Sequence, residues 1–311
     1  MRAVFMGTPE FAVPTLAALG AGGVEIASVI TQPDRPAGRG QSPAASPVKR
    51  LAQELGLAVF EPERIRAPEA VEQVRRAAPD VIVVVGYGQI LPRAVFELPR
   101  LGTLNVHASL LPRYRGAAPI QWAIARGETT TGITTMCINE GLDTGDILLQ
   151  RETPIGEQET APELAARLAP LGAELLLDTV RRLEAGSLQP RPQQEALATY
   201  APLLKKQDGR IEWSLAGADI ANRIRGFDPW PGAYTGFRGQ LLHVRRARRA
   251  GGEPAPAGVL RVEGRRLFAS SGDGWLELLE LQPEGRRRMA AGEFINGRRP
   301  LTGETLGEVR T

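Results

Sequence analysis

Hydrophobic residues in the first half of the chain gather in short runs, and stretches with helical spacing separate these runs. Because strands buried on both faces appear as continuous apolar runs, we expect strands at residues 2–7, 24–31, 57–60, 80–87 and 103–108. Helical spacing predicts helices that begin at Thr8, as an N-cap, and at 46–55 and 161–184, the last one kinked or split at Pro170. This alternation predicts an α/β fold, with an open, mostly parallel sheet and helices on both faces.

The pattern changes in the second half of the chain. Residues 187–206 lack periodicity and have the composition of a linker. A helix at 214–226 then precedes short β-like runs at 241–245, 259–262, 266–269 and 275–281, several of them separated by Gly-rich turns. The sequence therefore predicts a first domain at 1–186, a linker at 187–206 and a small antiparallel β-barrel domain at 207–311.

Length and composition agree with two globular domains. The chain has 311 residues, 42% of them hydrophobic, and no apolar run approaches the ~20 residues of a membrane-spanning helix. The N-terminus lacks the pattern of a signal peptide. The single cysteine, Cys137, excludes an intramolecular disulfide and a cysteine-based zinc cluster, and two histidines are too few for a His-rich metal centre. We expect a cytoplasmic protein without membrane association and without a metal.

Charge is unevenly distributed along the chain. The net charge is +3, yet residues 206–311 hold 18 Lys and Arg against 13 Asp and Glu, so the rest is slightly acidic. Such an excess fits a domain that binds a polyanion, and it fits a solvated basic surface equally well.

The first candidate catalytic residues lie at the end of the fifth predicted strand. Alternation along a strand puts Asn105 and His107 on one face, and the carboxyl ends of parallel strands border the ligand crevice. An amide beside an imidazole suits a developing oxyanion and a proton transfer. Taken alone, the pair fits a structural Asn and a structural His at least as well. His243, inside a predicted strand, is expected to be structural.

An acidic loop at 140–146 follows. Asp-Thr-Gly-Asp is usually a turn; its functional use would be to bring Asp143 near His107, where a carboxylate orients the imidazole. An aspartic-protease signature is excluded because no second copy exists. Nicotinamide chemistry is disfavoured because the turn after the first strand has one glycine, Gly7, and an acidic Glu10.

Two further loops stand at the expected crevice. The segment at 31–47 has no large apolar anchor, which is typical of a functional or a disordered loop. The segment at 86–92 follows the most buried strand and, by itself, reads as a tight turn before a helix.

Together these segments resemble the folate-dependent formyltransferases. Asn105-x-His107, the following Ser-Leu-Leu-Pro-x-Tyr-Arg-Gly and the later Asp143-x-Gly-Asp look like the catalytic set of that superfamily. The opening Phe-x-Gly-Thr-Pro-Glu-Phe, the loop at 32–40 and Asn222-x-x-Arg-Gly-Phe-Asp-Pro-Trp-Pro-Gly are similar to the branch that acts on tRNA. The match spans essentially the whole chain and favours the functional interpretation of each motif.

The resemblance implies a Rossmann-like catalytic domain and a C-terminal, OB-like barrel that binds tRNA. It implies transfer of a formyl group from 10-formyltetrahydrofolate to the α-amino group of methionine on initiator methionyl-tRNA, by a monomer. By motif position, Asn105, His107 and Asp143 are expected to be catalytic. The expected folate-binding residues are Gln89, Ile90, Leu91, Ser109, Leu110, Leu111 and Pro112, and the expected tRNA-binding residues are Arg35, Arg39, Lys205, Lys206, Arg245 and Arg246.

Two other interpretations stay open at this point. The chain could formylate another amine, such as a nucleotide sugar or glycinamide ribonucleotide, and the loop at 35–40 is the better discriminator between these enzymes. A non-catalytic RNA-binding module is the alternative from a different class, and the presence of Asn105, His107 and Asp143 together argues against it.

Overall fold

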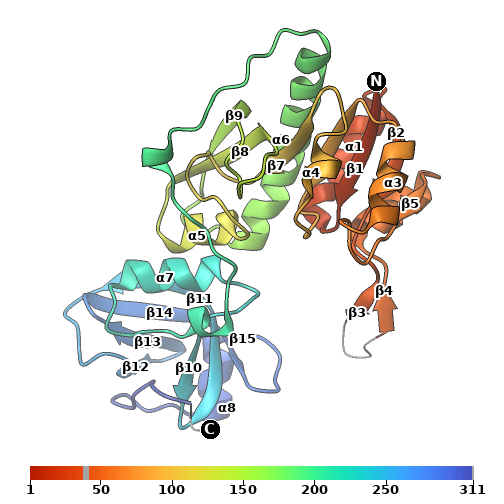
Figure 1. Cartoon of the computed structure of the whole chain (residues 1–311). Helices are drawn as coiled ribbons and strands as arrows, with labels where there is room; N and C mark the ends of the chain where they lie inside the picture. Colours follow the sequence, from red (N-terminus) through yellow and green to blue (C-terminus); the bar gives the residue numbers. More distant parts are fainter. Residues whose placement is uncertain (38–41, 310–311) are drawn as a thin grey trace. The chain divides into compact units, whose positions relative to one another are not determined.

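The chain divides into two compact units. The computed structural model describes residues 1–37 and 42–309, with the side chains of 35–37, 42 and 43 left out. Met1–Pro119, Thr130–Pro154 and Ala165–Ala201 form the first unit, and Ile120–Thr129, Ile155–Leu164 and Pro202–Thr311 form the second (Figure 1). Two short segments that lie between parts of the first unit in the sequence therefore belong to the second unit.

A seven-stranded sheet forms the centre of the first unit, in the order β5-β2-β1-β6-β7-β8-β9. The strands from β5 to β7 are parallel, whereas β8 and β9 are antiparallel. The predicted mostly parallel sheet is thus confirmed; β8 and β9 lay outside the predicted runs because their polar residues interrupt the apolar pattern. The bounds are β1 Arg2–Gly7, β2 Glu25–Ile30, β5 Val59–Phe60, β6 Val81–Val85, β7 Thr103–His107, β8 Thr130–Cys137 and β9 Ile147–Pro154.

Helices cover both faces of this sheet, as the sequence predicts. On one face Val4 and Ile82 belong to the same buried cluster as Val74 of α3 and Phe96 of α4. Among the described residues no helix is long and apolar enough to cross a membrane. The bounds are η1 Glu10–Ala12, α1 Val13–Ala21, α2 Pro47–Glu54, α3 Pro68–Arg76, α4 Arg93–Phe96, α5 Pro119–Ala125 and α6 Ala161–Glu184.

The long helix α6 packs on the opposite face, beside β7 and β8 (Figure 1). At Gly172 of α6 an added Cβ would lie 2.9 Å from Val106 Cγ1, so the helix approaches the sheet closely there. Since side chains alternate along a strand, Asn105 and His107 point away from α6, toward the face that α3 and α4 cover.

Helix ends show where local signals hold and where they fail. The Ser46 side chain accepts a hydrogen bond from Lys49 N at 3.1 Å and caps α2, as expected. The expected N-cap at Thr8 is wrong: its hydroxyl donates to the carbonyl of Tyr87 (3.1 Å), and a 3₁₀ turn starts the helix instead. Pro170 neither splits α6 nor ends it, and its ring lies on the exposed side.

The segment after β2 contains a two-stranded ribbon, β3 Arg35–Ala37 paired with β4 Ser42–Ala44. Polar side chains join the two ends of this segment at its base. The hydroxyls of Thr31 and Ser46 lie 2.8 Å apart, and Lys49 Nζ lies 2.7 Å from both Asp34 Oδ2 and Glu61 Oε2. These two carboxylates raise the pKa of Lys49. The Lys49 ammonium group therefore forms an ion pair with each of them at the base of the ribbon.

An antiparallel sheet forms the second unit, in the order β10-β11-β14-β13-β12, with β15 paired to β14. Its buried cluster includes Ile220 and Ile224 of α7 and Phe294 of α8. Three of the predicted strands are longer than expected, because polar residues and glycines continue the pairing: Arg246 to Gly251 in β11, Ser270 and Ser271 in β13, and Gly274 and Gln282 in β14. The bounds are η3 Lys206–Gly209, α7 Gly217–Gly226, β10 Tyr234–Phe237, β11 Gln240–Gly251, β12 Leu260–Glu263, β13 Arg266–Ser271, β14 Gly274–Pro283, β15 Met289–Ala290 and α8 Ala291–Arg298.

The predicted small antiparallel domain is present, but its OB-like barrel is not closed in the described part of the chain, where β10 and β12 form no ladder with each other. Single bridges join Gly236 to Gly307 and Val259 to Thr305, so the C-terminal tail spans the gap between the two edge strands. Because each bridge is isolated, the tail forms no continuous strand with either edge of the sheet. The sheet is therefore an open one whose edges the tail covers.

Residues 120–129 and 155–164 belong to the second unit because α7 packs on them. The rings of Trp122 and Phe227 meet edge to face, with centroids 5.4 Å apart. Arg225 Nη1 donates to the carbonyls of Gly156 (3.2 Å) and Glu159 (3.0 Å). An added Cβ at Gly226 would lie 2.9 Å from Ala125 N and 2.9 Å from Gln121 O, so the absence of a side chain permits this contact.

We expect the Glu277→Gln variant to be less stable than the unaltered protein at neutral pH, by about 1–3 kcal/mol. Glu277 is 6% exposed, and hydrogen bonds from Arg266 and Arg248 lower its pKa to about 2. A depressed carboxylate pKa stabilises the fold above the ordinary value of 4.5, and this stabilisation is lost as the pH falls toward about 2. Thermal melts of both proteins across this pH range test the prediction; a difference in Tm that does not shrink at acidic pH contradicts it.

Candidate active site

The imidazole of His107 lies at the end of β7 and is 6% exposed. Its Nε2 lies 2.9 Å from the carbonyl oxygen of Tyr114. Because a carbonyl oxygen only accepts hydrogen bonds, this contact requires a hydrogen on Nε2 and leaves Nδ1 as the nitrogen that can gain or lose a proton. Nδ1 lies 3.7 Å from Asp143 Oδ2, so the expected approach of Asp143 to His107 is observed.

The loop that carries Asp143 is fixed at its backbone and at its carboxylate. Asp143 adopts φ +53°, a left-handed conformation that Asp tolerates better than most residues. Its Oδ2 accepts a hydrogen bond from Gly116 N at 2.8 Å. Gln193 Nε2 donates to the carbonyls of Asp143 (2.8 Å) and Gly145 (2.7 Å). The backbone N–H of Gly116 therefore holds the carboxylate next to the imidazole, and the side chain of Gln193 holds the backbone of the loop.

The Asn105 side chain makes no hydrogen bond with any part of the chain that the structure describes, and it is partly exposed. It lies two residues before His107 on the same strand and therefore on the same face of the sheet. An unengaged amide beside a buried imidazole leaves an N–H donor available to a bound molecule. The three residues expected to be catalytic thus converge on one place.

The residues Ser109 to Pro112 form a loop that β8 and β9 hold. Ser109 is fully buried, and its carbonyl accepts from Thr134 Oγ1 at 2.6 Å. Gln150 Nε2 donates to the carbonyl of Leu111 (2.9 Å) and to Thr134 Oγ1 (3.0 Å). Sequence reasoning missed Thr134 and Gln150, and the sequences of β8 and β9, in which apolar and polar residues do not alternate, carry no clear signal for them.

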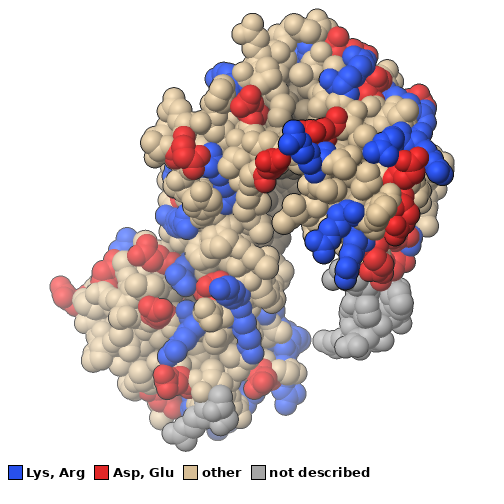
Figure 2. Space-filling model, in the orientation of Figure 1, with Lys and Arg blue, Asp and Glu red and all other residues tan. Residues whose placement is uncertain are grey.

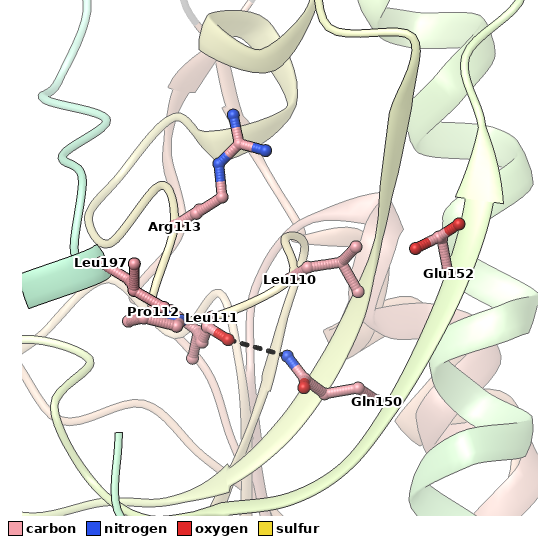
Figure 3. A pocket seen from close by; sticks show the side chains of 7 residues that line it. All are labelled: Leu110, Leu111, Pro112, Arg113, Gln150, Glu152 and Leu197. Carbon is pink, nitrogen blue, oxygen red and sulfur yellow. Dashed lines mark hydrogen bonds between the residues drawn. The ribbon is translucent and has the colours of Figure 1, made fainter. Parts of the chain in front are cut away.

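A pocket of about 510 Å³ opens beside this loop (Figure 3). Three expected folate-binding residues, Leu110, Leu111 and Pro112, line it. The close-up shows the hydrogen bond from Gln150 to the Leu111 carbonyl at the pocket wall. The remaining lining residues are Arg113, Gln150, Glu152 and Leu197.

The expected residues after β6 have three different surroundings. Gln89 is engaged inside the protein: its Oε1 accepts from Ile65 N at 2.7 Å, and its Nε2 donates to Pro62 O at 3.2 Å. Leu91 belongs to the buried core, whereas Ile90 is 91% exposed. None of the three lines the pocket beside Leu110, so the structure places the seven expected folate-binding residues in two groups.

The residues expected to contact tRNA also differ in their surroundings. Arg39 lies outside the described residues, and only the backbone of Arg35, in β3, is described. Arg245 is mostly buried and bonded to Asp228 Oδ1 (3.2 Å), and burial lowers its pKa. The Arg246 side chain is half-exposed, and its Nη2 lies 3.0 Å from Glu163 Oε1. Lys205 and Lys206 are exposed.

Basic and acidic side chains alternate over the visible surface of the second unit (Figure 2). Several of the Arg residues there form ion pairs, among them Arg248 with Glu277 and Arg249 with Asp273. The excess of positive charge is therefore partly neutralised locally. In contrast, the ammonium groups of Lys205 and Lys206 have no acidic partner within the described residues.

Residues 191–201, expected to be part of a linker, are bonded along the first unit. Arg191 exchanges backbone hydrogen bonds with Ile147, and Thr199 O accepts from Arg115 N at 2.9 Å. Arg115 itself is 1% exposed, and its Nη1 contacts both carboxylate oxygens of Glu195 (3.0 and 2.8 Å). Linker composition gave no signal of these contacts, which depend on residues far apart in the sequence.

His243 and Cys137 lie where structural residues are expected. His243 is half-buried in β11 with its ring edge to face against Tyr234, and burial lowers its pKa. Cys137 ends β8, and burial raises the pKa of its thiol. In the parts of the chain that the structure describes, no group of three His, Cys, Asp or Glu lies close enough together to hold a metal ion.

Comparison with solved structures supports the fold. WlaRD, a sugar 3N-formyl transferase, is similar with a TM-score of 0.67 and 19% identity over 92% of this chain and 99% of that chain. HypX from Aquifex aeolicus in complex with tetrahydrofolic acid is similar with a TM-score of 0.63 and 17% identity over 98% of this chain. This chain spans about half of HypX, namely 48%.

Comparison of sequences shows which family the chain belongs to. Residues 1–180 match the family model for formyl transferase, and residues 203–299 match the model for the formyl transferase C-terminal domain. Methionyl-tRNA formyltransferase of Solibacter usitatus (strain Ellin6076) is 58% identical over 310 residues, 99% of each chain. The enzyme of that name from Koribacter versatilis (strain Ellin345) is 53% identical over 311 residues, also 99% of each chain. Both domains and nearly every residue are thus accounted for, and the chain belongs to the methionyl-tRNA formyltransferases of the formyl transferase family.

Proposed function

We propose that the protein transfers the formyl group of 10-formyltetrahydrofolate to the α-amino group of methionine on initiator methionyl-tRNA, for translation initiation. The observation that carries this proposal is the convergence of Asn105, His107 and Asp143 at the end of β7, in a chain similar over its full length to methionyl-tRNA formyltransferases. 10-Formyltetrahydrofolate supplies the formyl group as a co-substrate.

The attacking amine must be neutral. A free α-amino group has a pKa of about 8, so a base that works near neutral pH suffices. Asn105 has an N–H donor that the described protein leaves unengaged, and it can donate to the formyl oxygen as negative charge grows there. We assign Asn105 this role.

His107 and Asp143 form the proton-handling pair. The Tyr114 carbonyl fixes the hydrogen on Nε2, so a proton taken from the amine enters at Nδ1, which faces Asp143. The separation of 3.7 Å is too long for a hydrogen bond, and such contacts in unliganded sites commonly tighten around the substrate. Asp143 then stabilises the imidazolium and holds its orientation. As the bond between N10 of the folate and the formyl carbon breaks, the imidazolium returns the proton to N10, and tetrahydrofolate leaves.

The folate is proposed to bind between the two groups of residues that the sequence singles out. Ile90, 91% exposed, and Leu142, 63% exposed, are large apolar side chains on the loops at 86–92 and 138–146. Exposed apolar side chains on these loops, together with the amide of Asn105, fit the flat, partly polar ring system of a folate. Leu110, Leu111 and Pro112 offer a second apolar surface, and Gln89 acts by holding the loop backbone.

We infer that tRNA is held by Lys205, Lys206, Arg35 and Arg39. The exposed ammonium groups lack acidic partners within the described residues, so they are available to phosphates. Arg245 and Arg246, which are bonded to Asp228 and Glu163, contribute to the positive field of this domain or contact tRNA after those pairs separate.

We expect Arg39→Ala to raise KM for methionyl-tRNA, or to lower kcat, without changing the affinity for the folate. Arg39 stands in the long Gly- and Pro-containing segment after β2, and a guanidinium can contact a phosphate or the end of the acceptor stem. Steady-state kinetics with both substrates, with Arg76→Ala at the exposed C-terminal end of α3 as control, test this. An unchanged KM and kcat for tRNA would remove Arg39 from the binding surface.

The decisive test of function is incubation of the protein with charged initiator tRNA and labelled 10-formyltetrahydrofolate. Label recovered on the methionyl amine supports the proposal. Formylation of a nucleotide sugar or glycinamide ribonucleotide in place of tRNA would contradict it, although the 58% identity to a methionyl-tRNA formyltransferase against 19% to a sugar enzyme disfavours that result. We further propose that the enzyme acts in the cytoplasm, as a monomer.

A further inference from the structure

The segment at 191–201 runs along the first unit beside the candidate active site. Its side chains reach both loops that hold Asp143: the one at 114–118 and the one at 143–145. We propose that Gln193 of this segment is a positioning residue that sets the geometry of the Asp143–His107 pair. The expected effect of Gln193 on catalysis rests on the proposed function, whereas its expected effect on the position of Asp143 does not.

The amide of Gln193 uses its acceptor and its donors at the same time. Oε1 accepts from Arg115 Nε at 3.0 Å, while Nε2 donates to the carbonyls of Asp143 at 2.8 Å and Gly145 at 2.7 Å. Among the side chains, only Gln and Asn combine one acceptor with two donors, and Asn is one methylene shorter. The residue type therefore matches the contacts it makes.

Arg115 gives Gln193 a rigid anchor. Its side chain is 1% exposed, so its charge requires partners, and Glu195 and Gln193 of the same segment supply them. The next residue, Gly116, donates its N–H to the Asp143 carboxylate at 2.8 Å. Arg115 and Gly116 thus connect the segment to Asp143 by a second route.

Steric fit makes this arrangement hard to displace. Gly116 has φ +116°, and an added Cβ there would lie 2.7 Å from the carbonyl oxygen of Ala201. At Gly145 an added Cβ would lie 1.8 Å from the carbonyl oxygen of Cys137. Both loops that hold Asp143 therefore pack tightly against backbone, and Gln193 bridges them.

We expect Gln193→Ala to lower kcat roughly 10- to 100-fold, because a shift of about 1 Å in a catalytic group can cost that much. KM for tRNA and for the folate should change little, since Gln193 lies in neither proposed binding surface. Gln193→Glu is the sharper variant: it fills the same space and keeps an acceptor for Arg115, but it places a carboxylate against two carbonyl oxygens. We expect it to be at least as impaired as Gln193→Ala. Gln194→Ala, the exposed neighbour, is the matched control and should behave as the unaltered enzyme.

A second measurement needs no substrate. The chain has two histidines, so the imidazole Hε1 resonances of His107 and His243 can be separated by NMR and assigned by substitution. Displacement of Asp143 in either Gln193 variant should move the His107 resonance and leave that of His243 in place. Because only folded molecules give the native His243 resonance, partial unfolding is recognised in the same spectrum.

The outcomes separate the positioning role from the proposed function. A fall in kcat with a moved His107 resonance supports the role. Normal kcat per folded molecule and an unmoved resonance in both variants would overturn it, as would full activity of Gln193→Glu. If the unaltered protein fails to formylate methionyl-tRNA, the proposed function fails, and the NMR measurement alone decides on Gln193.

Discussion

His107→Ala should reduce kcat for formylation of methionyl-tRNA by at least ~100-fold, as loss of a general acid or base typically does. Nδ1 of His107 is the only site on this imidazole where a proton can enter, because Nε2 is held by the Tyr114 carbonyl. Asp143→Ala should cost a similar factor, because the carboxylate faces that nitrogen at 3.7 Å. Rapid-quench or steady-state assays with saturating substrates measure both.

Folding should be retained in both variants, and this separates chemistry from stability. Asp143 lies on a loop, and His107 lies at the end of a strand whose buried apolar residues are Leu104 and Val106. His243→Ala and Asp178→Ala are matched controls: one is the other histidine, and the other is an exposed carboxylate on α6. Near-normal kcat with a normal melting curve in either test variant would mean that the catalytic assignment is wrong.

Replacement of both Lys205 and Lys206 by Ala should weaken tRNA binding and reduce its salt dependence. Each lost phosphate contact removes roughly 0.7 to 0.9 from the slope of log K against log salt, so the double variant should lose up to about twice that. Affinity for the folate should not change, because its proposed site lies in the first unit. The measurement is a tRNA titration over a salt series with the full-length chain, since a cut at Lys206 would divide the second unit from its residues 120–129 and 155–164.

Arg75 and Arg76 provide the control for this experiment. They are also adjacent, and their side chains are 55% and 79% exposed on α3, so replacing both with Ala removes the same charge elsewhere. We expect their replacement to leave the slope unchanged. If the lysine and arginine double variants give equal affinities and equal slopes, only net charge matters and the lysines make no specific contact.

Local sequence determined the elements whose signals lie within a few neighbouring residues. The run at 81–85 formed the buried strand β6, and Ser46 capped α2, because each depends on hydrophobicity or on a hydrogen bond three residues away. Thr8 failed as an N-cap since its hydroxyl has a better partner in Tyr87, 79 residues along the chain. The OB-like barrel stays open for a related reason: closure depends on strand pairing at long range, and the C-terminal tail bridges to Gly236 and Val259 instead.

Sequence by itself also determined which residues gather near the end of β7. Alternation put Asn105 and His107 on one face, and the motif resemblance selected Asp143 from a loop that reads as an ordinary turn. Only the tertiary structure decided how Asp143 is held, because its partners Gly116 and Gln193 come from segments 27 and 50 residues away. It likewise separated the paired Arg245 from Lys205 and Lys206, which have no acidic partner among the residues that the structure describes. An ion pair depends on the distance between side chains, whereas composition counts charges without their neighbours.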